Sequence, residues 1–241
     1  MGTRDDSFWA QLLGVEPADW NKSGISYRPH FGLSGYQGFW SFRRKDRVVV
    51  SAPASWVDRL RLIFAGWDQD RLMDQSALSG ALGADFDRLI GPTFQGCFEL
   101  ASVRNGFARQ VRSLVPADSK AIEVFRMECG ATDWGSSGLD EAAAWRYAYF
   151  DDEKITAMAG YRSRSEDAGD PCVLTHPRFR GSGRGAAVAR AVVANAVSKG
   201  KLLLYQTLES NKAAVRIALS LGYQRYASHI AVRLKHAVPR P

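Results

Sequence analysis

The chain has 241 residues, enough for one large domain or two small ones with a sizeable core. Its apolar content is ordinary for a globular protein, and no stretch approaches the roughly 18 consecutive apolar residues of a membrane span. The net charge of +7 is spread over scattered arginines and lysines without a dense basic block. A soluble basic surface explains this charge as well as nucleic-acid binding does, and a phosphorylated small molecule also suits it.

The N-terminal residues MGTRDDSFWAQLLG lack the basic start and the long apolar core of a secretory signal peptide. Asp6 occupies the position where N-myristoylation requires Ser or Thr. The cysteines Cys97, Cys129 and Cys172 are odd in number and far apart, which argues against a disulfide framework and against a zinc site. We therefore expect a cytoplasmic protein with reduced thiols, no metal and no membrane partner.

The first predicted elements mix helix and strand. Residues 5–14 read as a short helix with acidic residues near its start, and residues 38–44 and 47–53 as the two strands of a hairpin. Residues 55–66 predict a helix that ends at a glycine. Its apolar residues fall on one helical face: Trp56, Leu60, Ile63 and Phe64.

Next along the chain, residues 73–83 and 84–91 predict two further helices that end before a proline. Residues 96–103 and 107–114 are strand-like and flank Asn105-Gly106, a strong turn dipeptide. No flexible linker follows. We place a soft domain boundary here, with an N-terminal α/β extension at 1–110 and a second domain at 111–241.

The second domain is predicted to begin near Val115-Pro116 with a helix capped by Asp118 or Ser119. Its elements follow in the order helix, strand, strand, strand, helix, strand, helix and strand. They span residues 117–129, 142–150, 154–162, 172–177, 183–198, 201–208, 211–223 and 228–234. Residues 130–141 and 164–171 are predicted loops.

A glycine-rich run, THPRFRGSGRGAAVAR at 175–190, joins a predicted strand to a predicted helix. The free amides of a first helical turn and the helix dipole favour an anion, and glycine lets the backbone approach closely. A P-loop would need a Gly-Lys-Ser/Thr sequence, which is absent. The dinucleotide fingerprint Gly-x-Gly-x-x-Gly/Ala fits Gly181, Gly183 and Ala186. However, Lys201 stands where an acid is expected, and too few residues remain for a doubly wound sheet.

Within this run, PRFRGSGRG resembles the acyl-CoA-binding signature of the GNAT superfamily of N-acyltransferases, Arg/Gln-x-x-Gly-x-Gly/Ala. Arg180, Gly183 and Gly185 fill its fixed places. The later run ESNKAAVRIALSLGY resembles the next motif of the family. The matching positions are Asn211, Ala214, Leu221, Gly222 and Tyr223. The resemblance covers about 115–236. It implies an α/β fold of the α+β type, with a mixed, mostly antiparallel sheet flanked by helices.

The resemblance also implies a site for acetyl-CoA as co-substrate, in an opening of the sheet between 172–177 and 201–208. Residues expected to pair with or touch the pantetheine arm are Val173, Leu174, Thr175 and Asn211. The diphosphate is expected to rest on the amides of Arg180, Gly181, Ser182, Gly183, Arg184 and Gly185. A primary amine of a small molecule or peptide would attack the thioester directly, while a backbone N–H stabilises the oxyanion.

One position departs from the family. Many members carry a tyrosine seven residues after the motif asparagine, placed to protonate the leaving thiolate, and here that position is Ala218. Either another acid or none serves, or the protein binds the cofactor without turnover. We favour turnover with another acid or with none, because a thiol with a pKa of about 8.5 leaves readily as its anion. Tyr205 and Tyr223 are possible substitutes that suit a core equally well.

For the general base we choose Glu128, which ends the first helix of the domain beside the loop that borders the acceptor site in this family. Asp170, His176 and Glu209 are the alternatives. Trp134 in the same loop either lines the acceptor pocket or packs in the core.

The sequence therefore predicts an acyl-CoA-dependent N-acetyltransferase. A CoA-binding sensor or scaffold without turnover and, with less support, a nicotinamide-dependent oxidoreductase are the rival functions. Residues 1–110 stay open as a degenerate GNAT-like half, a lid or a dimerisation surface, so a homodimer is one expectation. Nucleic acid is not an expected partner.

Overall fold

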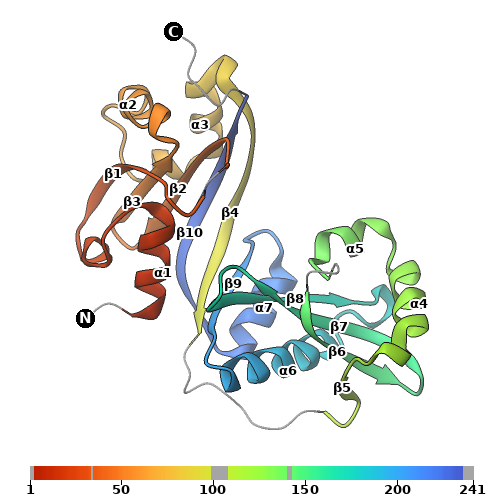
Figure 1. Ribbon diagram of the computed structural model, residues 1–241. Helices are drawn as coiled ribbons and strands as arrows, with labels where there is room; N and C mark the ends of the chain where they lie inside the picture. Colours follow the sequence, from red (N-terminus) through yellow and green to blue (C-terminus); the bar gives the residue numbers. More distant parts are fainter. Residues whose placement is uncertain (1–2, 34, 99–107, 140–142, 236–241) are drawn as a thin grey trace. The chain divides into compact units, whose positions relative to one another are not determined.

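The computed structural model describes residues 3–33, 35–98, 108–139 and 143–235 (Figure 1). The chain forms two compact units. The first comprises Met1–Gln95, Thr207–Lys212 and Arg225–Pro241, and the second comprises Gly96–Gln206 and Ala213–Gln224. Compactness and family membership can divide a chain differently, so the boundary at residue 110 stays a prediction. The structure adds that C-terminal residues belong to the first unit.

The first unit is built on a sheet with the strand order β1-β3-β2-β10-β4. These strands are β1 (Gly24–Pro29), β2 (Gly38–Arg44), β3 (Arg47–Ala52), β4 (Phe86–Phe98) and β10 (Tyr223–Leu234). The hairpin of β2 and β3 confirms the predicted pair of strands, with Lys45 in the left-handed region at its turn. The sequence did not predict β1, which pairs in parallel with β3.

Three α-helices, all expected from the sequence, pack in the first unit. They are α1 (Arg4–Leu13), α2 (Ala54–Ile63) and α3 (Gln75–Leu82). Trp56 and Leu60 of α2, with Phe64 just beyond it, are fully buried against β-strand residues such as Phe39 and Ile230. Burying a large apolar side chain typically contributes about 1.5–3 kcal/mol, so this face anchors the helix.

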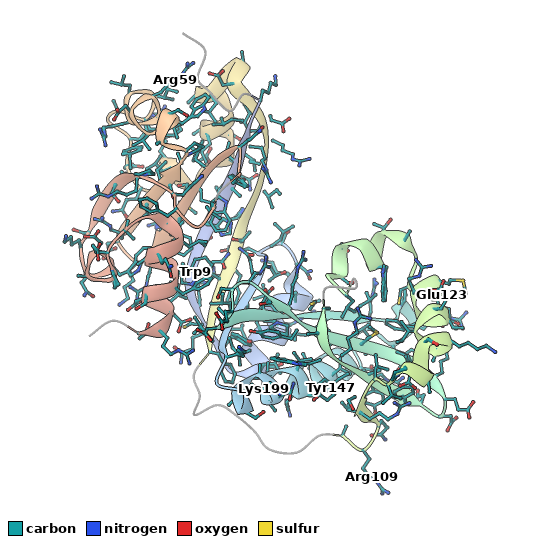
Figure 2. All side chains as sticks on the ribbon, viewed as in Figure 1. Trp9, Arg59, Arg109, Glu123, Tyr147 and Lys199 are labelled. Atoms are coloured by element: carbon teal, nitrogen blue, oxygen red, sulfur yellow. The ribbon has the colours of Figure 1, made fainter. Side chains whose placement is uncertain are left out.

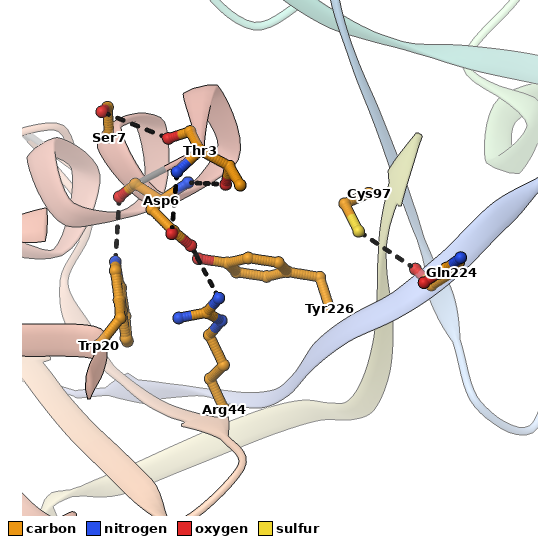
Figure 3. Close-up of polar contacts among 8 residues, drawn as sticks. All are labelled: Thr3, Asp6, Ser7, Trp20, Arg44, Cys97, Gln224 and Tyr226. Atoms are coloured by element: carbon orange, nitrogen blue, oxygen red, sulfur yellow. Dashed lines mark hydrogen bonds and ion pairs between the residues drawn. The ribbon is translucent and has the colours of Figure 1, made fainter. Parts of the chain in front are cut away.

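A polar network ties α1 to the sheet (Figure 3). The carboxylate of Asp6 accepts the backbone N–H of Thr3, forms an ion pair with Arg44 at 2.9 Å and accepts the hydroxyl of Tyr226 at 2.8 Å. The backbone carbonyl of Asp6 accepts the indole N–H of Trp20 at 3.0 Å. Trp9 of α1, labelled in Figure 2, is buried, and its ring stacks on that of Tyr226 with the ring centres 6.4 Å apart. The buried Asp6 is thus satisfied by several donors, as a buried charge requires.

One predicted helix of this unit is wrong. Residues 84–91 form the 3-10 turn Gly83–Asp85 and the start of β4 instead. Phe86, Leu89 and Ile90 are spaced three and four apart, which mimics a helical face, but they continue into a strand whose buried part begins at Thr93. The strand-like residues 99–107, with Asn105-Gly106, lie outside the described residues.

The second unit has the strand order β9-β8-β7-β6-β5. Its strands are β5 (Val111–Ser113), β6 (Ala144–Asp151), β7 (Lys154–Ser163), β8 (Ala168–Thr175) and β9 (Leu202–Leu208). All neighbours are antiparallel except β8 and β9, which run parallel. This mixed, mostly antiparallel sheet with flanking helices confirms the predicted fold class.

Four helices belong to this part of the chain: α4 (Ser119–Cys129), α5 (Ala131–Ser137), α6 (Arg184–Ser198) and α7 (Lys212–Leu221). In Figure 1, α6 covers one face of β6, β7 and β8, and α4 and α5 lie on the other face. The predicted loop at 130–141 is wrong where it contains α5, a short helix with no buried residue and hence no apolar pattern to reveal it. Within the described ranges, no helix is both long and apolar enough to cross a bilayer.

Candidate functional site

The sheet of the second unit opens between β8 and β9. β8 pairs with β7 over seven positions, from Ser163↔Gly169 to Ala157↔Thr175. With β9 it pairs at Ala168↔Leu202 and Gly169↔Leu203 alone, although both strands continue. The opening expected between these strands is therefore present. Val173, Leu174 and Thr175, the predicted partners of the pantetheine arm, lie beyond the last pair, where the β9 side of β8 has no strand partner among the described residues.

The glycine-rich loop follows β8 directly. The chain leaves the strand through His176, makes a 3-10 turn at Pro177–Phe179 and enters α6 at Arg184. Gly181 and Gly183 have φ of 79° and 82°, and neither would crowd a neighbour if it carried a Cβ. Both positions therefore require glycine for their left-handed backbone and not for lack of space.

The N–H of Arg178 donates to Nδ1 of His176, and the other amides of this loop fall into two groups. Turn bonds use the N–H groups of Phe179, Arg180 and Ser182, which donate to carbonyl oxygens three residues earlier. Within the described residues, no intramolecular acceptor is recorded for the remaining amides: Gly181, Gly183, Arg184 and Gly185. Three of these belong to the cap and first turn of α6, where the helix dipole also favours an anion. For Arg180 only the side chain is left as a donor, while the hydroxyl of Ser182 already donates to the carbonyl of Phe179.

Gly185 has a different reason to be glycine. A Cβ on Gly185 would lie 2.6 Å from Oγ1 of Thr175 and 3.5 Å from Cγ1 of Val173, both on β8. A contact of 2.6 Å forces one element to shift. The missing side chain thus lets the first turn of α6 approach the open strand closely, so that its free amides lie next to β8.

Arg180 and Arg184, two arginines of the loop, are engaged differently. Arg184 forms an ion pair with Asp151 at 2.6 Å, and its guanidinium lies 4.1 Å from the ring centre of Phe179. Its side chain is only 18% exposed, so it holds the loop to the turn between β6 and β7. Arg180 pairs with Asp133 and is 54% exposed. It can therefore exchange this partner for an incoming anion at low cost.

The carboxylate of Glu128, the predicted base, already has two partners. Its carboxylate accepts a hydrogen bond from Nζ of Lys154 at 2.9 Å and lies 3.4 Å from Nε2 of His176. The hydrogen bond from Lys154 lowers the pKa of Glu128 below its usual range. A carboxylate with a lowered pKa is a weaker proton acceptor, which disfavours general-base chemistry here.

Asp170 has the opposite environment. It is the one carboxylate on β8 and follows Gly169, the last residue paired with β9. Burial raises the pKa of Asp170 above its usual range, although the ion pair with Arg164 at 2.6 Å opposes this effect. Arg164 also donates to the side chain of Gln206 on β9 at 3.3 Å. The Asp170–Arg164–Gln206 contacts therefore link the two strands where they diverge.

The residues considered as the acid are core residues. Tyr205 and Tyr223 are buried and pack with ring centres 5.1 Å apart at an interplanar angle of 63°. Burial raises the pKa of Tyr205 above its ordinary value. Ala218, at the position of the family tyrosine, is fully buried on α7. Trp134 packs against the core of the second unit.

Two further candidates belong to the first unit. The backbone N–H of Asn211, the predicted contact of the cofactor arm, donates to the carbonyl of Leu208 at 3.0 Å. Glu209 forms an ion pair with Arg225. The described residues contain no group of three or more His, Cys, Asp or Glu side chains that could hold a metal ion.

Comparison with known proteins finds a family model that matches part of the chain. Residues 149–232 match the family model described as "FR47-like protein", which is GNAT-related, and this confirms the resemblance seen in the two motifs. The search of curated proteins finds no match to this chain.

Three solved structures illustrate the similarity. A GNAT-family protein from Novosphingobium aromaticivorans is 24% identical with a TM-score of 0.49, over 61% of this chain and 65% of that one. A GNAT-family acetyltransferase from Colwellia psychrerythraea is 14% identical with a TM-score of 0.49, over 63% and 59%. A GCN5-related N-acetyltransferase from Kribbella flavida is 18% identical with a TM-score of 0.47, over 67% and 63%. This chain thus spans less than two thirds of each of them.

Proposed function

We propose that this chain, whose residues 149–232 match a GNAT-related family, is an N-acetyltransferase that moves an acetyl group from acetyl-CoA to a primary amine. One observation supports this most: the unpaired side of β8 lies next to the free amides that begin α6. The first can pair with an extended amide-containing arm, and the second can hold its diphosphate. We further propose that it works in the cytoplasm without a metal, on a small-molecule or peptide amine, with a homodimer still open.

In this proposal, the amides of Gly181, Gly183, Arg184 and Gly185 hold the diphosphate of acetyl-CoA, and Arg180 adds an exposed positive charge. Backbone groups from Val173 to Thr175 pair with the pantetheine arm. Ser182 and Asn211 remain sequence-based predictions for cofactor contacts. Arg184 contributes its amide, because its side chain is already committed to Asp151.

The reaction needs a proton acceptor for the attacking amine. The amine nitrogen forms a bond to the thioester carbon, the carbon–sulfur bond breaks, and the sulfur leaves with the electron pair. The amine proton passes to a carboxylate, and we assign this role to Asp170 in preference to Glu128. A backbone N–H of β8 stabilises the charge that develops on the thioester oxygen.

The released thiolate takes a proton from water, because the buried phenols of Tyr205 and Tyr223 lie in the core. Tyr205→Phe and Tyr223→Phe should each lower kcat by less than about tenfold. A thousandfold loss in either variant, with CoA affinity and melting temperature unchanged, would show that this phenol is the acid.

Two measurements test the function. Acetyl-CoA at one hundred times its Kd should stabilise the protein by about 2.7 kcal/mol, which a melting curve shows easily, and NADH should not. A shift with NADH and none with acetyl-CoA would support the oxidoreductase instead. A thiol-release assay over a panel of amines should then show turnover. Tight CoA binding without turnover on any amine would favour the sensor.

A further inference from the structure

His176 occupies the junction between the open strand and the glycine-rich loop. Its backbone N–H donates to the carbonyl of Thr156 on β7 at 3.0 Å, and its carbonyl accepts the N–H of Phe179 at 2.9 Å. The imidazole is buried, with only 5% of the residue exposed. The backbone of His176 therefore bonds both to strand β7 of the sheet and to the first turn of the loop.

The two ring nitrogens of His176 have separate partners. Nδ1 accepts the backbone N–H of Arg178 at 3.2 Å, so the ring hydrogen of the neutral imidazole is on Nε2. Nε2 faces Oε2 of Glu128 at 3.4 Å, and Oε1 of Glu128 accepts from Lys154 on β7. A chain of contacts thus runs from β7 through Glu128 and His176 to the backbone of the turn.

We propose that Glu128 and His176 are positioning residues that set the glycine-rich loop for acyl-CoA. This inference rests on the proposed function and assigns Glu128 a role other than the general base. The reason lies in the backbone of the turn itself, as distinct from the side-chain contacts of Arg180, Ser182 and Arg184. Between His176 and Gly183 the backbone has three turn bonds, two of them 3.4 Å long. The Nδ1 contact with Arg178 is an additional bond that fixes the turn, and Glu128 fixes the orientation of the ring that makes it.

The glycines make this support necessary. Gly181 and Gly183 carry two of the free amides, and a glycine has more backbone freedom than any other residue. A loosely held turn would let these amides rotate away from a common target. The expected consequence of losing the His176 ring is weaker acyl-CoA binding, with little effect on the chemical step once acyl-CoA is bound.

The experiment compares steady-state kinetics and calorimetric CoA binding for the wild type and four variants. His176→Ala should raise KM for acetyl-CoA and Kd for CoA about tenfold, with kcat and the amine KM within about threefold. His176→Asn keeps a capping acceptor for the Arg178 amide and should recover most of the affinity. Glu128→Gln should raise KM by about threefold. Glu123→Gln is the matched control, because Glu123 lies on the same helix (Figure 2) but pairs with the exposed Arg126, and it should change nothing.

The outcomes separate this inference from the proposed function. Wild-type CoA binding that His176→Ala leaves unchanged would overturn the positioning role alone. A fall of kcat by more than a hundredfold in Glu128→Gln, with KM unchanged, would also overturn it and restore Glu128 as the base. If the wild type binds no CoA, both proposals fail. If His176→Ala folds poorly, the test uses His176→Asn and Glu128→Gln instead, and melting temperatures show that these two variants are folded.

Discussion

Strands β3 and β8, each described within its own unit, are alike in burial but differ in how they use their backbone. All six residues of β3 are buried, and it pairs along its length with β1 on one side and β2 on the other. β8 is almost as buried, yet its pairing with β9 ends at Gly169. Buried backbone groups without partners cost free energy, and such groups are rare in native proteins. A saturated strand such as β3 therefore acts as scaffold, and the open strand β8 is where we propose that the pantetheine arm pairs.

The largest expected effect concerns the carboxylate at the point where β8 opens. Asp170→Asn should lower kcat by about a thousandfold, since a positioned proton acceptor typically contributes 10²–10⁴-fold. Glu128→Gln should lower it by less than about threefold. Steady-state assays of both variants with the best amine decide between the two carboxylates. Equal losses in the two variants, or a larger loss in Glu128→Gln, would contradict our assignment.

A second effect compares a glycine of the loop with a glycine of the first unit. Both have a left-handed backbone conformation. Gly183 has φ of 82° before α6, and Gly66 has φ of 75° after α2. A β-branched residue is strained at either position, at a typical cost of about 1–3 kcal/mol. Gly183→Val should weaken CoA binding by at least about a hundredfold, because the strained turn moves the neighbouring amides.

The matched variant Gly66→Val should lower the melting temperature to a similar extent and leave Kd for CoA within about twofold. Calorimetric titration at one salt concentration measures both variants. If Gly183→Val binds CoA as tightly as the wild type, the diphosphate does not lie on this loop.

A third effect tests whether His229 is buried as a neutral ring in the scaffold of the first unit. Nδ1 of His229 lies 2.7 Å from Oγ1 of Thr93 and 2.7 Å from Nε2 of Gln95, and the ring stacks on Trp40 at 4.2 Å. Burial lowers the pKa of His229 to about 3, while an unfolded histidine titrates near 6.5. The unfolded state therefore binds more protons between these values, and stability falls as the pH decreases below about 6.5. At pH 5 the loss is about 2 kcal/mol.

Urea unfolding of the wild type and His229→Gln at pH 7 and pH 5 measures this loss. The variant should lose much less stability on acidification than the wild type. Asp5, whose pKa burial raises to about 6, acts in the opposite direction, but it is present in both proteins and cancels in the comparison. Parallel pH dependences in the two proteins would show that His229 is not buried as a neutral ring.

The smallest effect concerns the arginines of the loop. Arg180→Ala should weaken CoA binding by only about threefold at physiological salt, because its exposed charge is screened. Arg184→Ala should instead lower the melting temperature, since its partly buried guanidinium contacts Asp151 and Phe179. Titrations and melting curves of both variants check this division. A hundredfold loss of affinity in Arg180→Ala would mean that its side chain is a main ligand of the diphosphate.

Much of the fold could be predicted because its signals are local. Trp56 and Leu60 show the buried face of α2, and Gly183 and Ser198 lie at the two ends of α6. The failures have non-local causes. Residues 84–91 carry a helical spacing, but sheet pairing decides their conformation. The strand β1 begins and ends with Gly24 and Pro29, residues that usually mark turns, and depends on its remote partner β3.

The sequence could predict only those parts of the candidate site that are formed by the backbone of the glycine-rich motif. The glycine pattern located the loop and the adjacent strand, because left-handed φ values at Gly181 and Gly183 are properties of residue type. The use of the side chains was not predictable. Glu128 is paired by Lys154 and His176, and Asp170 by Arg164, and these partners come together only through the fold.

The return of the chain into its first unit has a consequence for biosynthesis. Strand β10 supplies Ser228–Arg233 as the partners of Gly38–Arg43 on β2, after all residues of the second unit have been made. On the ribosome, the unit that begins first therefore finishes last. Until β10 emerges, the nascent chain carries β2 with a bare edge, the kind of surface that invites wrong pairing and that chaperones guard. A release of the polypeptide before β10 would leave that edge exposed permanently.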